Sequence, residues 1–239
     1  MELKGKKALV TGGGSGYGRG IAAALVKAGA ETWITGRNRG KLESAAREIG
    51  AKAIVADVTS GADWDRVISE IGEIDVLVNN AGSGGRIADV AEQSDDDIAG
   101  TIAVNLTGAI MGCARAARMM KQKGGGVIVN ISSVCAIHAW PAWGVYTAAK
   151  AGLRKFSHAL HAELRPSGVR VTCVMPSWGR TDFNAAAGIR GASEDGALAG
   201  QCMAPEELGA IVRGIIEQPD HLTVPEVTVQ PMVQEIVPM

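Results

Sequence analysis

The chain has 239 residues, of which 46% are hydrophobic, so it can bury the core of one domain of ordinary size. Its 24 basic and 25 acidic residues nearly cancel, which argues against a nucleic-acid-binding protein and against a polybasic membrane-surface protein. A high hydrophobic content with a low net charge also excludes a disordered chain.

The four cysteines lie far apart and form no CxxC pair or Cys/His ligand spacing, so we expect neither a metal site nor a disulfide framework. The first apolar stretch, residues 8–10, is too short for the core of a signal peptide. No window approaches roughly 18 uninterrupted apolar residues, so no transmembrane span is expected. These features predict a soluble protein of the cytoplasm.

Short runs of Val and Ile alternate with Ala-rich stretches of helical spacing. Near-continuous apolar runs of this kind are typical of buried parallel strands. The predicted strands are 8–10, 32–35, 53–55, 76–78, 127–131 and 169–174. A long helix is predicted over 146–165, where Pro166 and Gly168 end it. Six alternations of strand and helix predict one α/β domain over residues 1–239, with a doubly wound parallel sheet in three layers.

A glycine-rich turn, Thr11-Gly-Gly-Gly-Ser-Gly-Tyr-Gly18, follows the first strand and precedes a helix. The free N–H groups and the dipole of a helix N-terminus favour a pyrophosphate. The spacing Gly12-x-x-x-Gly16-x-Gly18 differs from the GxGxxG dinucleotide fingerprint, but it can serve similar purposes. Gly12 would form the turn, Gly16 would let the backbone approach the ligand, and Gly18 would pack helix on strand. The alternative is a flexible turn without a ligand.

The end of the second strand bears on the choice of dinucleotide. An acidic residue there binds the ribose 2′-OH of NAD, whereas an Arg accommodates the 2′-phosphate of NADP. Here Gly36 leaves room and Arg37 offers a planar fork for a phosphate. We therefore predict NADP(H), with NAD(H) as the alternative. In the opposing interpretation, Arg37 is only a solvated residue at a helix start.

Two further strand ends carry polar residues. Asp57 ends the third strand and either accepts a hydrogen bond from an adenine amino group or caps the next helix. Asn79-Asn80-Ala81-Gly82 ends the fourth strand and suits either a closely approached backbone or an ordinary turn. Because ligands bind at the carboxyl ends of parallel strands, we favour ligand contact.

Tyr146 and Lys150 lie four residues apart and share one face of the predicted helix. A phenol with its reference pKa of ~10 is a poor base near neutrality, and a neighbouring ammonium lowers that pKa. A Tyr tuned in this way can exchange a proton with an alcohol or carbonyl oxygen. A surface Tyr beside a surface Lys is the alternative.

Ser132 and Ser133 close the fifth strand, and Ser133 lies 13 residues before Tyr146. A serine hydroxyl at this edge of the sheet can hydrogen-bond the reacting oxygen as charge develops. Either serine could instead be the N-cap of the next turn.

Together with Asn105 in Val104-Asn-Leu-Thr-Gly108, these motifs resemble the short-chain dehydrogenase/reductase family over nearly the whole chain. The resemblance implies a Rossmann-like fold. It implies that Tyr146 is the general acid/base, that Ser133 steadies the substrate oxygen and that Asn105 supports a water-linked proton relay. Lys150 would lower the pKa of Tyr146 and hold the nicotinamide ribose. The implied cofactor contacts are Gly12, Ser15, Gly16, Tyr17, Gly18, Arg37, Asp57, Val58, Asn79, Ala81, Gly82, Tyr146, Lys150, Pro176 and Thr181.

Several residues depart from the family pattern. Tyr17 stands where the family usually has Ile, and Ser15 stands where many NADP-dependent relatives carry Lys or Arg. Met175-Pro-Ser177 replaces the usual Asn-Pro-Gly, so Pro176 and Thr181 are carried over as contacts while Ser177 is not. The segment 222–231 resembles the subgroup that acts on 3-hydroxy acids and related small alcohols.

The irregular segment 177–203 follows the sixth strand and is a candidate substrate lid. Arg180 within it either clamps an anionic group or is solvated. We predict a small anionic hydroxy compound as substrate. The aromatic residues near this segment suit the wall of a small-molecule pocket. In the alternative interpretation, some of the tryptophans pack at a subunit interface. The predicted substrate contacts are Cys135, His138, Trp143, Trp178 and Arg180, with Trp140 nearby.

The function predicted is hydride transfer between NADP(H) and a small alcohol or carbonyl substrate. The alternatives are an NAD-dependent dehydrogenase, a dinucleotide-binding sensor without turnover, and an epimerase or dehydratase on the same fold. The resemblance also implies a homo-oligomer, a tetramer or a dimer, formed through the helices that bear Asn105 and Tyr146.

Overall fold

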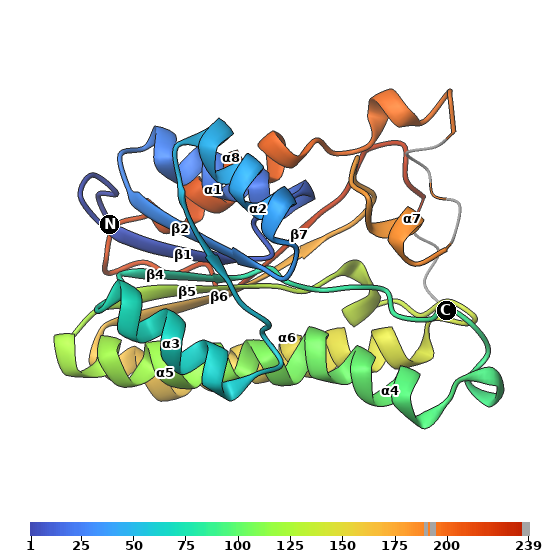
Figure 1. Ribbon diagram of the computed structural model, residues 1–239, viewed down its shortest axis with the longest axis horizontal. Coiled ribbons are helices and arrows are strands. Elements are labelled where there is room, and N and C mark those ends of the chain that lie inside the picture. The colour runs from blue at the N-terminus through green and yellow to red at the C-terminus, as the bar shows by residue number, and fades with distance from the viewer. Residues whose placement is uncertain (189–190, 192–194, 236–239) are drawn as a thin grey trace.

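A parallel sheet of seven strands forms the centre of the computed structural model, which describes residues 1–188, 191 and 195–235 (Figure 1). The strand order is β3-β2-β1-β4-β5-β6-β7. The strands are β1 Lys7–Thr11, β2 Glu31–Gly36, β3 Lys52–Val55, β4 Val76–Asn79, β5 Gly126–Ile131, β6 Val169–Pro176 and β7 Glu226–Val229. The predicted doubly wound Rossmann-like sheet is therefore confirmed.

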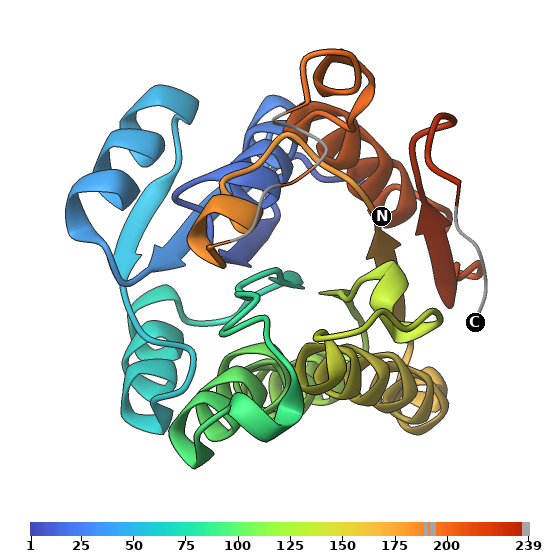
Figure 2. The same ribbon diagram turned by 90° about the vertical axis from the view of Figure 1, so that its right-hand side faces the viewer.

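Helices cover both faces of the sheet and complete the three layers (Figure 1). On one face lie α1 Gly16–Lys27, α2 Arg39–Ile49 and α8 Pro205–Ile216. On the other face lie α3 Gly61–Ile71, α5 Gly108–Lys123 and α6 Gly144–Leu164. Two shorter helices, α4 Asp95–Ile102 and α7 Phe183–Ala186, lie at the end of the molecule that faces the viewer in Figure 2.

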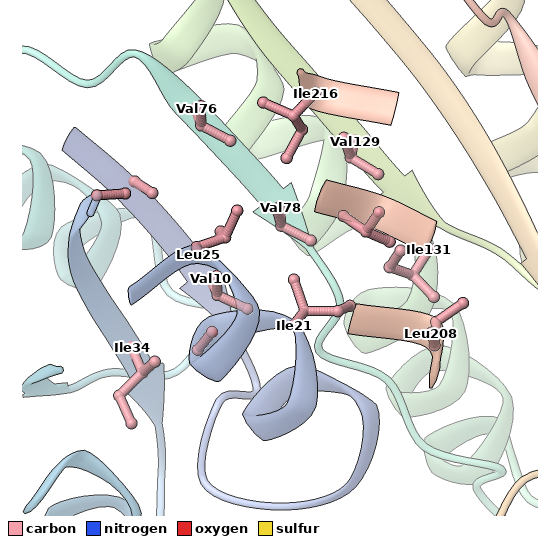
Figure 3. Packing of buried hydrophobic residues seen from close by; sticks show 14 of the residues in the cluster. Val10, Ile21, Leu25, Ile34, Val76, Val78, Val129, Ile131, Leu208 and Ile216 are labelled. Carbon is pink, nitrogen blue, oxygen red and sulfur yellow. The ribbon is translucent and has the colours of Figure 1, made fainter. Parts of the chain in front are cut away.

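Two hydrophobic cores lie on opposite faces of the sheet because successive side chains of a strand alternate between its faces. Val10 and Val78 point to the α1 and α8 side, where Ile21 and Leu208 pack against them (Figure 3). Leu77 belongs to the core beneath α3, α5 and α6. Each such side chain is almost fully buried, and burying it contributes about 1.5–3 kcal/mol.

The chain reverses its direction across the sheet between β1 and β4. From β1 it proceeds outward to β2 and β3, and it then returns to β4 on the other side of β1. The loops that leave the carboxyl ends of β1 and β4 therefore diverge and leave a crevice, the usual ligand site of an open α/β sheet. The Thr11 hydroxyl oxygen accepts hydrogen bonds from the backbone N–H groups of Asn80 and Ala81, both at 3.0 Å.

The seventh strand was not predicted from the sequence. β7 consists of Glu-Val-Thr-Val, and its residues are half-buried or exposed, because it pairs only with β6 at the edge of the sheet. Such an edge strand lacks the apolar run that marks the buried strands.

One helical run in the described part of the chain, Asp95–Lys123, has the length and apolar composition of a membrane span. It consists of α4, a π-helical turn and α5. Cys113, Ala116 and Met120 of this run are fully buried against the sheet. The run is therefore accounted for as a helix of the core.

Candidate active site

A cavity of about 590 Å³ lies at the carboxyl edge of the sheet. Its volume is in the range of small-molecule sites, about 300–1,000 Å³. The wall comes from the glycine turn, the ends of β4 and β5, the start of α6 and the segment after β6. The predicted site residues that line it are Gly12, Ser15, Gly16, Tyr17, Ala81, Gly82, Ser133, Cys135, Trp143, Tyr146, Lys150, Pro176, Trp178 and Thr181.

The glycine turn has the backbone that its sequence predicts. Gly12 and Gly16 have φ of +66° and +51°, a region that disfavours side chains. Gly18 lies where helix and turn meet, and a Cβ added there would lie 2.2 Å from the carbonyl oxygen of Gly12. Ser15 occupies the N-cap of α1 without a capping hydrogen bond from its side chain, and no acidic residue lies in the first turn. The N-terminus of α1 thus faces the cavity without a negative charge.

Asn80 belongs to the predicted motif at the end of the fourth strand but was not among the implied cofactor contacts, and its side chain holds this turn in place. Its side-chain amide donates to the carbonyl oxygens of Thr11 at 3.0 Å and Gly12 at 3.3 Å. Asn79 instead points to the opposite face, where its amide donates to Asn130 at 2.9 Å. The alternation of strand residues provides the signal for this difference, because Asn79 has the same parity as the buried Leu77.

Tyr146 and Lys150 are both buried in the first turns of α6, at 6% and 4% exposure. The Lys150 Nζ donates a 3.0 Å hydrogen bond to the carbonyl oxygen of Ile131 and lies 5.7 Å from the centre of the Tyr146 ring. Lys150 is thus held between the end of β5 and the phenol.

Burial governs the protonation of this pair. It raises the pKa of the Tyr146 phenol, an effect to which the nearby Cys135 adds and which a hydrogen bond with Ser133 opposes. Burial lowers the pKa of Lys150 to about 8. Desolvation of the phenolate thus dominates the Tyr146 pKa in this arrangement, and the lowering of that pKa by Lys150 stays a prediction.

The two serines at the end of β5 have different partners. Ser132 donates its hydroxyl hydrogen to the carbonyl oxygen of Lys150 at 2.8 Å and is buried. Ser133 lines the cavity, and its oxygen accepts a hydrogen bond from the backbone N–H of Cys135 at 3.2 Å. Ser133 is thus both the cap of a short 3₁₀ turn and a hydroxyl beside the phenol. Its two proposed roles are compatible.

Asn105 lies behind the cavity wall in a π-helical turn, Ala103–Thr107. Such turns are rare in proteins overall, and those that occur are often found at functional sites. Its amide donates to the carbonyl oxygen of Ser83 at 2.8 Å, and its oxygen accepts from the Ser83 N–H at 3.2 Å. A Cβ added at Gly82 would lie 2.8 Å from the Asn105 oxygen and 3.3 Å from the Lys150 Nζ. Asn105 and Lys150 therefore approach the same backbone position.

Aromatic rings surround the phenol. Trp143 contacts the Tyr146 ring edge-on at 5.5 Å between centroids, and Phe183 of α7 lies 5.5 Å from it. The Trp143 and Phe183 rings stack at 6.5 Å. Ala142, just before Trp143, has a φ of +68°, the single left-handed residue other than glycine in the described chain. A non-glycine residue in this region is strained, and such residues cluster at functional sites.

Other predicted site residues lie outside the cavity wall. Arg37 is exposed directly after β2. Asp57 accepts hydrogen bonds from the N–H and hydroxyl of Thr59, at 2.9 and 2.8 Å, whereas the cap of α3 is Ser60. Val58 borders only a small void beside Asn79. The remaining predicted residues that do not line the cavity are Gly18, Asn79, Asn105, His138 and Arg180.

The predicted lid, 177–203, is described in part. Its residues 189–190 and 192–194 lie outside the described residues. Within the described part, Thr181, Phe183 and Gly191 line the cavity. Arg180 is exposed, and its backbone N–H donates to Met203 at 2.9 Å.

The described residues fit a nicotinamide dinucleotide. The turn at Gly12 and Gly16 leaves backbone accessible, and the N-terminus of α1 favours a pyrophosphate. Farther along the cavity, Tyr146 offers a hydroxyl, and Lys150 offers an ammonium that lies near Gly82. Among the described lining residues, Lys150 and Asp182 are the only charged side chains.

The chain is similar to known proteins over most of its length. The family model of the short chain dehydrogenases matches residues 6–189. D-threitol dehydrogenase of Mycolicibacterium smegmatis is 37% identical over 186 residues, which are 74% of this chain and 71% of that protein.

Two solved structures resemble the whole fold. A 3-ketoacyl-(acyl-carrier-protein) reductase from Brucella melitensis, complexed with NADH, has a TM-score of 0.85 at 28% identity, covering 95% of this chain and 98% of its own. A metagenomic short-chain oxidoreductase in complex with NADP has a TM-score of 0.82 at 29% identity, covering 98% and 100%.

Proposed function

Because the chain belongs to the short-chain dehydrogenase/reductase family, whose members are NAD(P)-dependent oxidoreductases, we propose that it transfers a hydride between NADP(H) and a small alcohol or carbonyl compound. The observation that carries the proposal is that Tyr146, Ser133 and Lys150 line one cavity with the glycine turn. The dinucleotide supplies the hydride chemistry when bound.

The protein residues would manage the proton. In carbonyl reduction, the Tyr146 hydroxyl gives its proton to the carbonyl oxygen while the hydride adds to the carbonyl carbon. In alcohol oxidation the same oxygen takes the proton back. The Ser133 hydroxyl would donate a hydrogen bond to the reacting oxygen, and the Lys150 ammonium would favour the phenolate that reduction leaves. Asn105, held by Ser83, would support the path by which Tyr146 is reprotonated.

NADP(H) is proposed over NAD(H) because of the end of β2. A Cβ added at Gly36 would meet only Leu42, at 3.4 Å, so this position leaves space for a phosphate. Arg37 follows on the surface, with no ion pair to any described residue. The two structural neighbours differ in this respect, one being complexed with NADH and the other with NADP.

For the substrate, we propose a small hydroxylated compound. The similarity to a D-threitol dehydrogenase and the polar groups in the cavity wall support this class. An anionic 3-hydroxy compound is the second candidate and depends on Arg180, whose side chain would have to turn toward the cavity. Kinetics of Arg180→Ala test it: an unchanged Michaelis constant for the best anionic substrate would reject this candidate.

We also propose that the protein is a cytoplasmic homo-oligomer, a tetramer or a dimer, that associates through α6 and through the helical run Asp95–Lys123, which bears Asn105. The support is the family resemblance of the helices that bear Asn105 and Tyr146. Sedimentation equilibrium tests the assembly, and a monomer at micromolar concentration would contradict it.

The function is tested by incubating the protein with NADPH or NADP⁺, and separately with NADH or NAD⁺, and a panel of aldehydes, ketones, polyols and hydroxy acids. A change in nicotinamide absorbance that requires both substrate and protein supports the proposal. Product without net cofactor turnover would instead indicate an epimerase or dehydratase. Cofactor binding without any reaction would indicate a sensor.

A further inference from the structure

Gln234, near the C-terminal end of the described chain, belongs to the wall of the same cavity. After β7 the chain turns at Pro231, whose carbonyl oxygen accepts a hydrogen bond from the Gln234 N–H at 3.0 Å. The Gln234 side chain is buried, with 6% of the residue exposed. A polar side chain this deeply buried requires hydrogen-bond partners.

Two donors fix the orientation of the Gln234 amide. The Ser177 hydroxyl donates to its oxygen, and the backbone N–H of Trp178 lies 3.4 Å from the same oxygen. A backbone N–H can only donate, so the side-chain oxygen and not the nitrogen must face Trp178. The NH₂ group consequently points elsewhere, and no described residue accepts a hydrogen bond from it.

We propose that the Gln234 NH₂ group donates a hydrogen bond to the substrate, at a polar atom other than the reacting oxygen. This inference rests on the proposed function, because it assigns a second contact to the substrate of Tyr146. Gln234 is then a specificity residue, and the substrate class is one with a hydroxyl or carbonyl oxygen besides the one that reacts. A neutral donor suits a neutral polyol or hydroxyketone.

Ser177 makes this contact possible. The family resemblance leads us to expect a glycine at this position, which would have no hydroxyl to orient Gln234. The main chain at Ser177 is itself fixed, because its N–H donates to Val229 at 2.9 Å and its carbonyl oxygen accepts from the Tyr17 hydroxyl at 3.2 Å. Two departures from the family pattern, Tyr17 and Ser177, therefore act on one hydrogen-bonded chain that ends at Gln234.

The test compares two secondary alcohols that differ in a carbonyl oxygen, which can only accept a hydrogen bond: 3-hydroxy-2-butanone and 2-butanol. The quantity measured is the ratio of kcat/KM for oxidation of the hydroxyketone to kcat/KM for oxidation of 2-butanol. Loss of one hydrogen bond to a neutral group is expected to lower this ratio about tenfold in Gln234→Leu. Gln234→Glu keeps an oxygen for Ser177 and Trp178 but loses the donor, so the same fall is expected. Gln230→Leu, an exposed position after β7, is the matched control and should leave the ratio unchanged.

Each outcome has a defined meaning. A lower ratio in both Gln234 variants, with unchanged NADPH affinity by fluorescence titration, supports the inference. An equal loss for both alcohols would show that Gln234 only anchors the C-terminal segment, and would overturn it. If Gln234→Leu fails to fold, Gln234→Glu decides, and Ser177→Gly should lower the ratio in the same direction. If the Gln234 variants turn over with an unchanged ratio, this inference alone is overturned. If the wild-type protein oxidises neither alcohol and reduces none of the panel's carbonyl compounds, the proposed function is overturned as well.

Discussion

The Lys150 ammonium lies 5.7 Å from the centre of the Tyr146 ring, one helical turn away, and is tied to the carbonyl oxygen of Ile131. The hydrogen bond to β5 keeps this charge at the base of the cavity rather than in solvent. Burial has opposite effects on the two groups, raising the pKa of the phenol and lowering that of the ammonium. Both pKa shifts favour the neutral form of the side chain, so the reaction rates should depend on pH.

The two reaction directions should respond oppositely to pH. A raised Tyr146 pKa keeps the phenol protonated at neutral pH, so the acid needed for carbonyl reduction is present there. Alcohol oxidation needs the phenolate and should accelerate as pH rises over about 7 to 10. Measuring kcat/KM in both directions across this range checks the sign. An oxidation rate that falls as the pH rises would contradict it.

Gly18→Ala should damage the cofactor site. Its methyl group would lie 2.2 Å from the carbonyl oxygen of Gly12, so α1 must move away from the turn. We expect NADPH binding to weaken at least about tenfold, measured by fluorescence titration. Gly214→Ala in α8 is the control, because nothing lies within 4 Å of its added methyl group. That variant should bind NADPH normally and gain about 0.5–1 kcal/mol of stability. Normal NADPH affinity in Gly18→Ala would refute the assignment of the glycine turn as part of the cofactor site.

Gly36→Asp should alter the cofactor preference. The position has room for a side chain, and a carboxylate there would repel a 2′-phosphate but accept a hydrogen bond from a 2′-hydroxyl. The dissociation constant for NADPH should rise about tenfold relative to that for NADH. If the wild-type protein already binds NADH more tightly than NADPH, the NADP(H) proposal is wrong.

Asp75 should support stability without affecting the site. Burial would raise the pKa of its carboxyl, but hydrogen bonds from Lys123 and from the Lys7 N–H, at 2.9 Å for the latter, hold it below its usual range. A lowered folded-state pKa contributes stability above the unfolded value of about 3.9, and this stability is lost as pH falls through the folded value.

Asp75→Asn should therefore cost about 1 kcal/mol at neutral pH, since the lysine partners are partly exposed, and less in acid. Thermal unfolding across pH measures this dependence. An equal loss at all pH values would show that charge is not the cause.

Much of this molecule could be predicted from the sequence because its signals are local. The apolar runs mark six of the seven strands, and the glycine turn has positive φ at two of its predicted positions. β7 escaped prediction because its sequence, Glu-Val-Thr-Val, alternates polar and apolar residues and therefore contains no apolar run. The side of the sheet to which Asn79 points was readable from strand parity.

Other features depend on contacts between distant segments. The Asn105 side chain in the π-helical turn is hydrogen-bonded to Ser83, 22 residues earlier. The contact of Ser177 with Gln234 spans 57 residues and has no sequence signature. The raised pKa of Tyr146 depends on the burial of its side chain, and the spacing of Tyr146 and Lys150 in the sequence does not predict that burial.

Tyr146→Phe tests the central claim most directly, since it removes one hydroxyl group and leaves the ring against Trp143 and Phe183. NADPH affinity and turnover should be measured on the same preparation, with Thr147→Val as a neighbouring control. We expect unchanged NADPH affinity and a loss of nearly all turnover, at least about 10²-fold. Substantial turnover in Tyr146→Phe would contradict the assignment of this phenol as the acid and base of the reaction.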